Sequence, residues 1–316
     1  MPQSDHFDGR RFFNPAGANG QPFSQVPKMM REPAARWPRQ VPLTPRRPGP
    51  RRRDGIVVSF VGHSTFLLQT SHGGILTDPV YVERASPVPF LGPARVRPPA
   101  IRFDDLPEIA LVLLSHNHYD HCDLRTLRAL GSRFNPRMVT PLNNRRVTGS
   151  AIREVEELDW WQTSTGGPFA VAVTPAQHFS ARTPFDRNKS LWGGFVFEVD
   201  GVRVFFAGDS GYGPHFREIG ARLGPIDLAL LPIGAYEPRW FMKDIHMNPD
   251  EAVRAHVELG AGRSIGMHFG TFQLTTEAID EPVRALADAR RLHGVEDEAF
   301  VTLDFGASLD VAPRRG

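Results

Sequence analysis

The 316-residue sequence contains one cysteine, Cys122, so no internal disulfide can form and a cysteine-based zinc finger is excluded. No apolar run reaches the length of about 18 residues that a membrane-spanning helix needs. The amino-terminal stretch MPQSDHFDGRRFFNPAG lacks the apolar middle region of a secretory signal. These absences predict a protein of the cytoplasm.

Charge is unevenly distributed along the chain. Residues 1–54 contain 11 Lys or Arg against 4 Asp or Glu, whereas the remainder contains 26 against 31. The first segment is also rich in Pro and Gly, which predicts an irregular basic arm over 1–54 and one folded domain over 55–316. The arm's basic stretch RWPRQVPLTPRRPGPRRRD has no aromatic residues at a spacing typical of nucleic-acid readers. No nucleic-acid partner is therefore expected.

Short apolar runs, separated by glycine or polar residues, recur from Ile56 onward. They predict strands over residues 56–62, 65–70, 73–79, 109–116, 137–142, 169–178, 193–201, 202–209, 228–235, 264–270 and 299–306. Helices are predicted over 123–131, 248–260 and 279–294, with Asp123 and Asn248 as N-caps and a glycine ending each helix. Many strands with few helices predict a mixed-sheet, layered α/β architecture.

A dense cluster of histidine and aspartate follows one of these predicted strands. The stretch SHNHYDHCD, residues 115–123, contains His116, His118, Asp120 and His121. Residues two apart in an extended segment project to the same side, so His116 and His118 can approach one ion while Asp120 and His121 serve a second. Imidazole and carboxylate ligands suit Zn²⁺, and also Fe or Mn. The cluster therefore predicts a paired metal site.

Four ligands cannot saturate two metal ions, so further ligands are expected at neighbouring strand ends. His178, Asp209 and His268 each end a predicted strand. The adjacent Cys122 is expected to pack under the metal loop. The remaining histidines His215, His256 and His293 are expected on the surface.

The HNHYDH stretch, with the downstream His, Asp and His, resembles the HxHxDH motif of the metallo-β-lactamase superfamily. A closer resemblance is to the family of N-acyl-phosphatidylethanolamine-hydrolysing phospholipase D and its bacterial relatives. It rests on SFVGHSTFLL, ILTDP, ASPVPFLGPARVRPP, PAQH, FAGDSGYG and LPIGAYEPRWFMKDIHMNPDEAV, and the matching segments run from about residue 55 to 285. The resemblance implies an αβ/βα four-layer sandwich with two facing mixed β-sheets and metals at one edge.

The resemblance also implies roles for single residues. It assigns His116, His118 and His178 to a first metal, Asp120, His121 and His268 to a second, and Asp209 to both. Asp120 and His246 are the predicted catalytic residues. His246 would contact the scissile phosphate or donate to the leaving group, although a capping or packing role is equally open. Asp78 is expected either to hydrogen-bond the metal loop and fix a histidine tautomer, or to be a turn residue. For His63 we favour a structural role.

The activity implied is hydrolysis of a phosphodiester by a dinuclear zinc site, in which a hydroxide shared by the ions attacks phosphorus. N-acyl-phosphatidylethanolamine-like lipids and other phosphodiesters are the expected substrates, and a lipid substrate would add peripheral contact with a membrane. A lactonase or other carboxylic-ester hydrolase, similar to ascorbate-phosphate lactonases, remains an alternative. So do a non-catalytic metal- or lipid-binding protein and, with only the basic arm in its favour, a nucleic-acid-processing enzyme. Oligomeric state is left open by the sequence.

Overall fold

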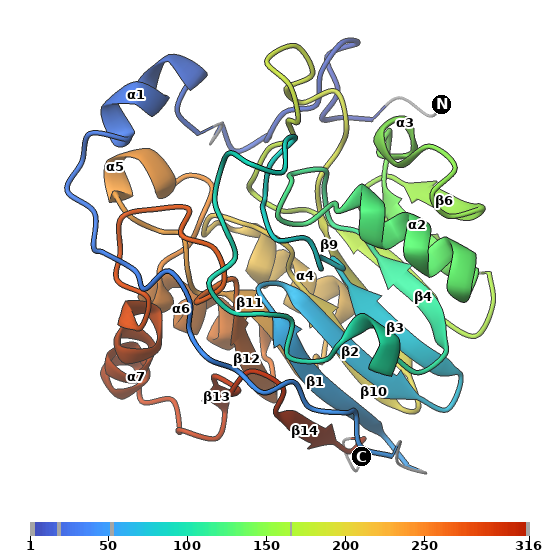
Figure 1. Ribbon diagram of the computed structural model, residues 1–316. Coiled ribbons are helices and arrows are strands. Elements are labelled where there is room, and N and C mark those ends of the chain that lie inside the picture. Colours follow the sequence, from blue (N-terminus) through green and yellow to red (C-terminus); the bar gives the residue numbers. More distant parts are fainter. Residues whose placement is uncertain (1–3, 18–19, 51–53, 165, 314–316) are drawn as a thin grey trace.

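Two β-sheets lie face to face, with helices against their outer sides (Figure 1). The computed structural model describes residues 4–17, 20–50, 54–164 and 166–313. Within these ranges each sheet has seven strands, and both sheets are mixed. The arrangement confirms the predicted class, an αβ/βα sandwich of two facing mixed sheets.

The first sheet has the strand order β14-β1-β2-β3-β4-β5-β6. Strands β14 to β3 pair antiparallel, and β3 to β6 pair parallel. Their bounds are β1 (Ile56–Gly62), β2 (Thr65–Thr70), β3 (Gly73–Thr77), β4 (Ile109–Leu113), β5 (Arg137–Pro141), β6 (Glu154–Leu158) and β14 (Ser308–Val311).

The second sheet has the order β13-β12-β11-β10-β9-β8-β7. Here β7 to β10 pair antiparallel, and β10 to β13 pair parallel. The strands are β7 (Thr163–Ser164), β8 (Ala170–Thr174), β9 (Gly194–Val199), β10 (Val202–Phe206), β11 (Leu228–Pro232), β12 (Arg263–Met267) and β13 (Phe300–Val301).

The helices cover both outer faces, which explains why the central strands are continuously apolar. In β4, Leu111 and Leu113 belong to the core between the sheets, whereas Val112 packs outward with Leu127 and Leu130 of α2. Strands buried on both faces have no solvent side to carry polar residues. The helices are α1 (Val26–Met29), α2 (Leu124–Arg133), α3 (Arg145–Thr148), α4 (His215–Leu223), α5 (Arg239–Met242), α6 (Pro249–Leu259) and α7 (Glu281–His293).

Most predicted elements are present, and the helix signals act as expected. Asp123 caps α2, Asn248 forms a capping box with Glu251, and Gly260 ends α6 in the left-handed conformation. The prediction that Gly131 ends α2 was wrong, because the helix continues to Arg133. Glycine is needed there because a Cβ atom would lie 2.1 Å from the carbonyl oxygen of Ala151.

Two histidines expected on the surface are buried instead. His215 begins α4, where its Nε2 lies 3.0 Å from Ser210 Oγ. His256 lies on the inner side of α6, with its Nδ1 2.8 Å from Ser264 Oγ of β12. Each hydroxyl gives the imidazole a partner, which makes burial tolerable. His293 is exposed and Cys122 is buried, as expected.

The amino-terminal arm runs over the domain and is anchored at several points. The side chain of Phe12 enters the main core. Asn14 Nδ2 donates to the carbonyl oxygen of His178 at 2.9 Å, and Trp37 Nε1 donates to that of Glu277 at 2.9 Å. His6 stacks on Trp160 with ring centroids 3.9 Å apart. The arm is therefore packed onto the domain. Among the described helices, none is both long and apolar enough to cross a membrane.

Candidate metal centre

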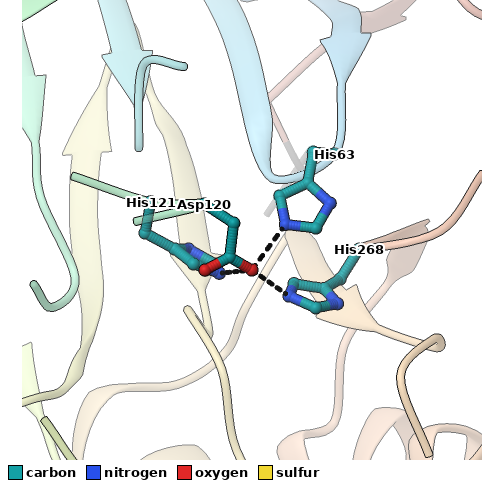
Figure 2. A group of neighbouring side chains, drawn as sticks. All are labelled: His63, Asp120, His121 and His268. Atoms are coloured by element: carbon teal, nitrogen blue, oxygen red, sulfur yellow. Dashed lines mark hydrogen bonds and ion pairs between the residues drawn. The ribbon is translucent and has the colours of Figure 1, made fainter. Parts of the chain in front are cut away.

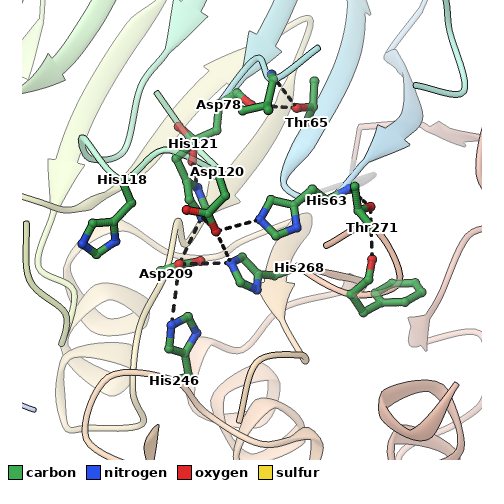
Figure 3. Close-up of polar contacts among 12 residues, drawn as sticks. His63, Thr65, Asp78, His118, Asp120, His121, Asp209, His246, His268 and Thr271 are labelled. Carbon is green, nitrogen blue, oxygen red and sulfur yellow. Dashed lines mark hydrogen bonds and ion pairs between the residues drawn. The ribbon is translucent and has the colours of Figure 1, made fainter. Parts of the chain in front are cut away.

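The seven predicted ligands meet at one edge of the two sheets. The loop after β4 brings His116, His118, Asp120 and His121, while three residues follow strands of the other sheet: His178 after β8, Asp209 after β10 and His268 after β12. Figure 3 shows Asp209 between His121, His268 and His246. The ligand roles are a prediction, and the structure supplies the convergence that they require.

Three imidazoles form the first group. His118 Nδ1 lies 2.8 Å from His116 Nε2 and 3.2 Å from His178 Nε2. His178 Nδ1–H donates to the carbonyl oxygen of Ile245, and His116 Nδ1–H donates to Ser115 Oγ, whose own hydrogen goes to Asp78. The Nε2 atoms of His116 and His178 therefore present lone pairs toward the same nitrogen of His118. A single N–H of His118 cannot donate well to both acceptors, whereas a cation between the three nitrogens could bind a lone pair from each imidazole.

Two carboxylates and two imidazoles form the second group. Asp209 Oδ2 lies 3.1 Å from the Nε2 atoms of both His121 and His268. Asp120 Oδ2 lies 3.5 Å from His121 Nε2 and 3.4 Å from His268 Nε2. The same oxygen of Asp209 is 3.9 Å from His116 Nε2 and 3.8 Å from His178 Nε2 in the first group. Asp209 thus stands between the two groups.

The two groups differ in charge. Burial lowers the pKa of His118 to about 3 and that of His178 to about 4, so both are neutral with free lone pairs. Burial also opposes charge on His268, but Asp209 and Asp120 outweigh it and raise the pKa of His268 to about 9. The same carboxylates raise the pKa of His121 well above its usual value. Ligands bind metal ions in their deprotonated form, so a cation bound by His121 and His268 would replace these protons.

The donor set fits divalent cations. Four-coordinate Zn²⁺ with bonds of about 2.0–2.1 Å places its ligand atoms about 3.3 Å apart. The separations within each group, 2.8–3.2 Å and 3.1–3.5 Å, lie around that value. Among the described atoms, His121 Nε2, His268 Nε2 and Asp209 Oδ1 are buried and have no hydrogen-bond partner. Buried polar atoms ordinarily have a hydrogen-bond partner, so these three atoms fit a site that binds a cation.

Asp78, directly after β3, connects the metal loop to the first sheet. Its fully buried carboxylate accepts from Ser115 N at 2.7 Å, from Ser115 Oγ at 2.6 Å and from His121 Nδ1 at 2.7 Å. Since Nδ1 carries the proton, His121 Nε2 is left to face Asp209. These contacts are the ones that a tautomer-fixing role requires.

His63 and His246 complete the surroundings. His246 is buried between α5 and α6, with its Nε2 3.8 Å from Asp209 Oδ2. His63, for which the sequence favoured a structural role, brings its Nε2 to 3.0 Å from Asp120 Oδ2. Sequence reasoning missed this contact, because a lone histidine in a short turn resembles any turn residue. The sequence feature that pointed to His63 was its position in VGHST, within one of the stretches that resemble the phospholipase D family.

Comparison with known proteins agrees with the fold. A model of the β-lactamase superfamily domain matches residues 74–269. The chain is 39% identical over 277 residues to N-acyl-phosphatidylethanolamine-hydrolyzing phospholipase D 1 of Caenorhabditis elegans, covering 82% of this chain and 77% of that protein. It is 35% identical to the mitochondrial enzyme of the same description from Saccharomyces cerevisiae, covering 72% of this chain and 50% of the yeast protein.

A solved structure shares the fold. Igni18, a metallo hydrolase from the archaeon Ignicoccus hospitalis, aligns with a TM-score of 0.59 at 21% identity, over 80% of this chain and 97% of that one. The chain is thus a metal-dependent hydrolase and belongs to the metallo-β-lactamase superfamily. Within that superfamily it groups with the relatives described as N-acyl-phosphatidylethanolamine-hydrolysing phospholipase D.

Asp78→Asn tests the tautomer-fixing role. The amide keeps the size of the carboxylate but weakens the acceptor for His121 Nδ1–H, so we expect metal affinity to fall about 10- to 100-fold. The measurement is zinc binding in competition with a chromophoric chelator, and thermal unfolding serves as the control for folding. Unchanged zinc affinity in a folded variant would show that Asp78 is a turn residue only.

Proposed function

We propose that the protein is a dinuclear metal-dependent phosphodiesterase of the phospholipase D type, which hydrolyses N-acyl-phosphatidylethanolamine-like or other phosphodiesters. The observation that supports it most is Asp209 Oδ2, which lies within 3.1–3.9 Å of imidazole nitrogens from both ligand groups. A carboxylate in that position can hold two ions close enough to act on one phosphoryl group. The descriptions of the nematode and yeast relatives supply the substrate class.

The proposed cofactor is two Zn²⁺ ions, with Fe or Mn as alternatives. His116, His118 and His178 would hold one ion, Asp120, His121 and His268 the other, and Asp209 both. When bound, such a pair supplies a water nucleophile of lowered pKa and offsets negative charge on the phosphoryl oxygens. The chain's part is to fix the ligand atoms. Asp78, Ser115 and the carbonyl of Ile245 do this by holding the histidine tautomers.

His246 is the proposed phosphate-contacting residue. Its ring lies 5.1 Å from that of His178 and 5.2 Å from that of His268, between the two ligand groups. Burial lowers the pKa of His246 well below its usual value, so the imidazole is neutral and can donate one hydrogen bond. Its Nδ1 is buried without a partner among the described atoms, which suits a bare acceptor, so the hydrogen belongs on Nε2, which faces the ligand groups. A phosphoryl oxygen entering the site would give this imidazole an acceptor.

A lipid bilayer with anionic headgroups is the proposed source of substrate. Large apolar side chains project from two loops: Phe90 and Leu91 are 78% and 66% exposed, and Phe185 is 80% exposed. Both loops border a pocket of about 480 Å³ that also contains Tyr119 and Cys122 of the metal loop. The same two segments contain Arg84, Arg182, Arg187 and Lys189, of which Lys189 is exposed and the three arginines are partly exposed. Exposed apolar tips among cations are complementary to an anionic interface.

Side-by-side assays test the activity. Metal-loaded protein is expected to hydrolyse bis(p-nitrophenyl) phosphate and N-acyl phospholipids but not lactones, and Asp209→Ala should reduce turnover to background. Turnover of lactones alone would replace the proposal with a lactonase. If the wild-type protein and Asp209→Ala are equally inert on every ester while the wild type binds two ions, the protein is a binding protein.

His246→Gln tests the phosphate contact. We expect kcat to fall about 10²- to 10⁴-fold with metal content unchanged, since the residue would act on the phosphate and not on the ions. The loss should be equal for a p-nitrophenyl ester and an alkyl ester. A loss confined to the alkyl ester, whose leaving group needs a proton, would assign His246 the role of general acid instead.

Serine at Phe90, Leu91 and Phe185 tests the membrane contact. We expect binding to anionic phosphatidylglycerol vesicles, measured by co-sedimentation, to weaken at least about tenfold, because even one buried apolar side chain contributes about 1.5–3 kcal/mol. Turnover of soluble bis(p-nitrophenyl) phosphate should not change. The matched control replaces Val257 of α6 and Leu292 of α7, 58% and 75% exposed, on another part of the surface. Equal losses in both variants would contradict the contact.

A further inference from the structure

The short turn between β1 and β2 projects a histidine into the metal centre. Strands β1 and β2 pair up to Gly62 and Thr65, which leaves His63 and Ser64 as the turn. His63 is a non-glycine residue in the left-handed region, with φ at 57°, and is only 1% exposed. Such a conformation costs of order 1–3 kcal/mol and persists only where the surroundings enforce it. An enforced, buried polar side chain at a site calls for a functional explanation.

The backbone of His63 is fixed to the other sheet. Its amide N–H donates to Thr271 Oγ1 at 3.0 Å, and its carbonyl accepts from the amide of His268 at 2.9 Å. The two imidazole rings lie 4.1 Å apart between centroids, and Phe272 packs edge-on against His63 at 5.2 Å. The turn is therefore held beside a predicted ligand by contacts that do not involve the His63 ring nitrogens.

The side chain reaches Asp120. Figure 2 shows three imidazoles directed at one oxygen of this carboxylate. His63 Nε2 is the nearest at 3.0 Å and has hydrogen-bond geometry, whereas His268 and His121 are at 3.4 and 3.5 Å. The latter two also contact Asp209 at 3.1 Å, a spacing suited to atoms that surround an ion. His63 has no such second carboxylate partner among its described contacts.

The tautomer of His63 follows from its surroundings. A carboxylate oxygen can only accept, so the hydrogen must lie on Nε2. His63 Nδ1 is buried without a partner among the described atoms, which is tolerable for a bare acceptor but not for a buried N–H. If Nε2 instead bound an ion, the proton would move to Nδ1 and be left unpaired. His63 is thus suited to donate to Asp120.

We propose that His63 is a positioning residue, which donates a hydrogen bond from Nε2 to Asp120 Oδ2 and holds that carboxylate in the orientation needed for the second ion. The inference rests on the proposed dinuclear site but not on its substrate. Asp120 is partly exposed on the metal loop, and the one described hydrogen bond that its carboxylate accepts comes from His63. Its other described side-chain contacts are with the predicted ligands His121 and His268. Without His63 its side chain could rotate away, and the second ion would lose one ligand.

Three substitutions separate the hydrogen bond from the fold. His63→Asn is tolerated in the left-handed region but is too short to reach Asp120, while His63→Gln places an amide N–H close to the position of Nε2. His63→Gly removes the backbone strain together with the side chain. Apo-protein is titrated with Zn²⁺ against a chromophoric chelator, which reports the two binding steps, and thermal unfolding is followed in parallel.

We expect the second binding step of His63→Asn and His63→Gly to weaken about 10- to 100-fold while the first is unchanged, with His63→Gln close to the wild type. Free imidazole should restore the second step in His63→Gly if His63→Gln does not fold. Co²⁺-substituted protein should keep its full visible absorption in His63→Gln. For a soluble ester, kcat should fall in His63→Asn with little change in KM.

Two results would overturn the inference. Unchanged binding of both ions by His63→Asn would make His63 a structural turn residue. An equal loss in folded His63→Gln and His63→Asn, with altered Co²⁺ absorption in both, would make it a direct ligand. Because zinc affinity is measured without substrate, the inference can hold even if the protein hydrolyses no phosphodiester.

Discussion

The structure depends on how the negative charge of a buried carboxylate, that of Asp209, is balanced. Its Oδ2 lies 3.1 Å from two imidazole nitrogens and 3.8–3.9 Å from three others, in a position that is 4% exposed. An isolated buried charge would be prohibitively costly. Burial opposes ionisation of Asp209, but His121 and His268 outweigh it and hold its pKa well below the usual value. Without metal, protons on these imidazoles provide the balance, and with metal the cations do. Binding of cations would therefore release these protons.

The sandwich surrounds Asp209 with imidazoles by bringing predicted ligands from both sheets to one edge. The loop after β4 belongs to the first sheet, whereas His178, Asp209 and His268 follow strands of the second. Contacts that fix the ligands also cross between the sheets, as in the bond from the amide of His268 to the carbonyl of His63. Positive φ at His63, Asp78 and His268 places this strained backbone around the same site. Strain of this kind is typical of functional sites, where the direction of a side chain matters more than a low-energy backbone conformation.

Much of this could be predicted from the sequence, because the signals were local. HNHYDH places four donors in six residues, and apolar runs ending in His178, Asp209 and His268 mark strand ends. The misses depend on packing that appears only in the folded chain. His63 contacts Asp120, 57 residues away, and nothing in the turn announces it. His215 and His256 are buried with serine hydroxyls five and eight residues away as partners, and their pairing appears only once the chain has folded. β6, with the sequence EVEEL, is too acidic to be recognised as a strand, and Gly131 is a point of close packing that resembles a helix stop.

The change in composition near residue 54 does not mark a structurally independent arm, because the arm is anchored to the domain. Asn14 donates a hydrogen bond to the carbonyl oxygen of His178, and Phe12 belongs to the main core, so this part of the arm helps to fix the backbone of a predicted ligand. The arm differs from the domain in composition, but it contacts the backbone of the metal centre directly. A substitution at Asn14 would therefore change the support of a predicted ligand without replacing any ligand.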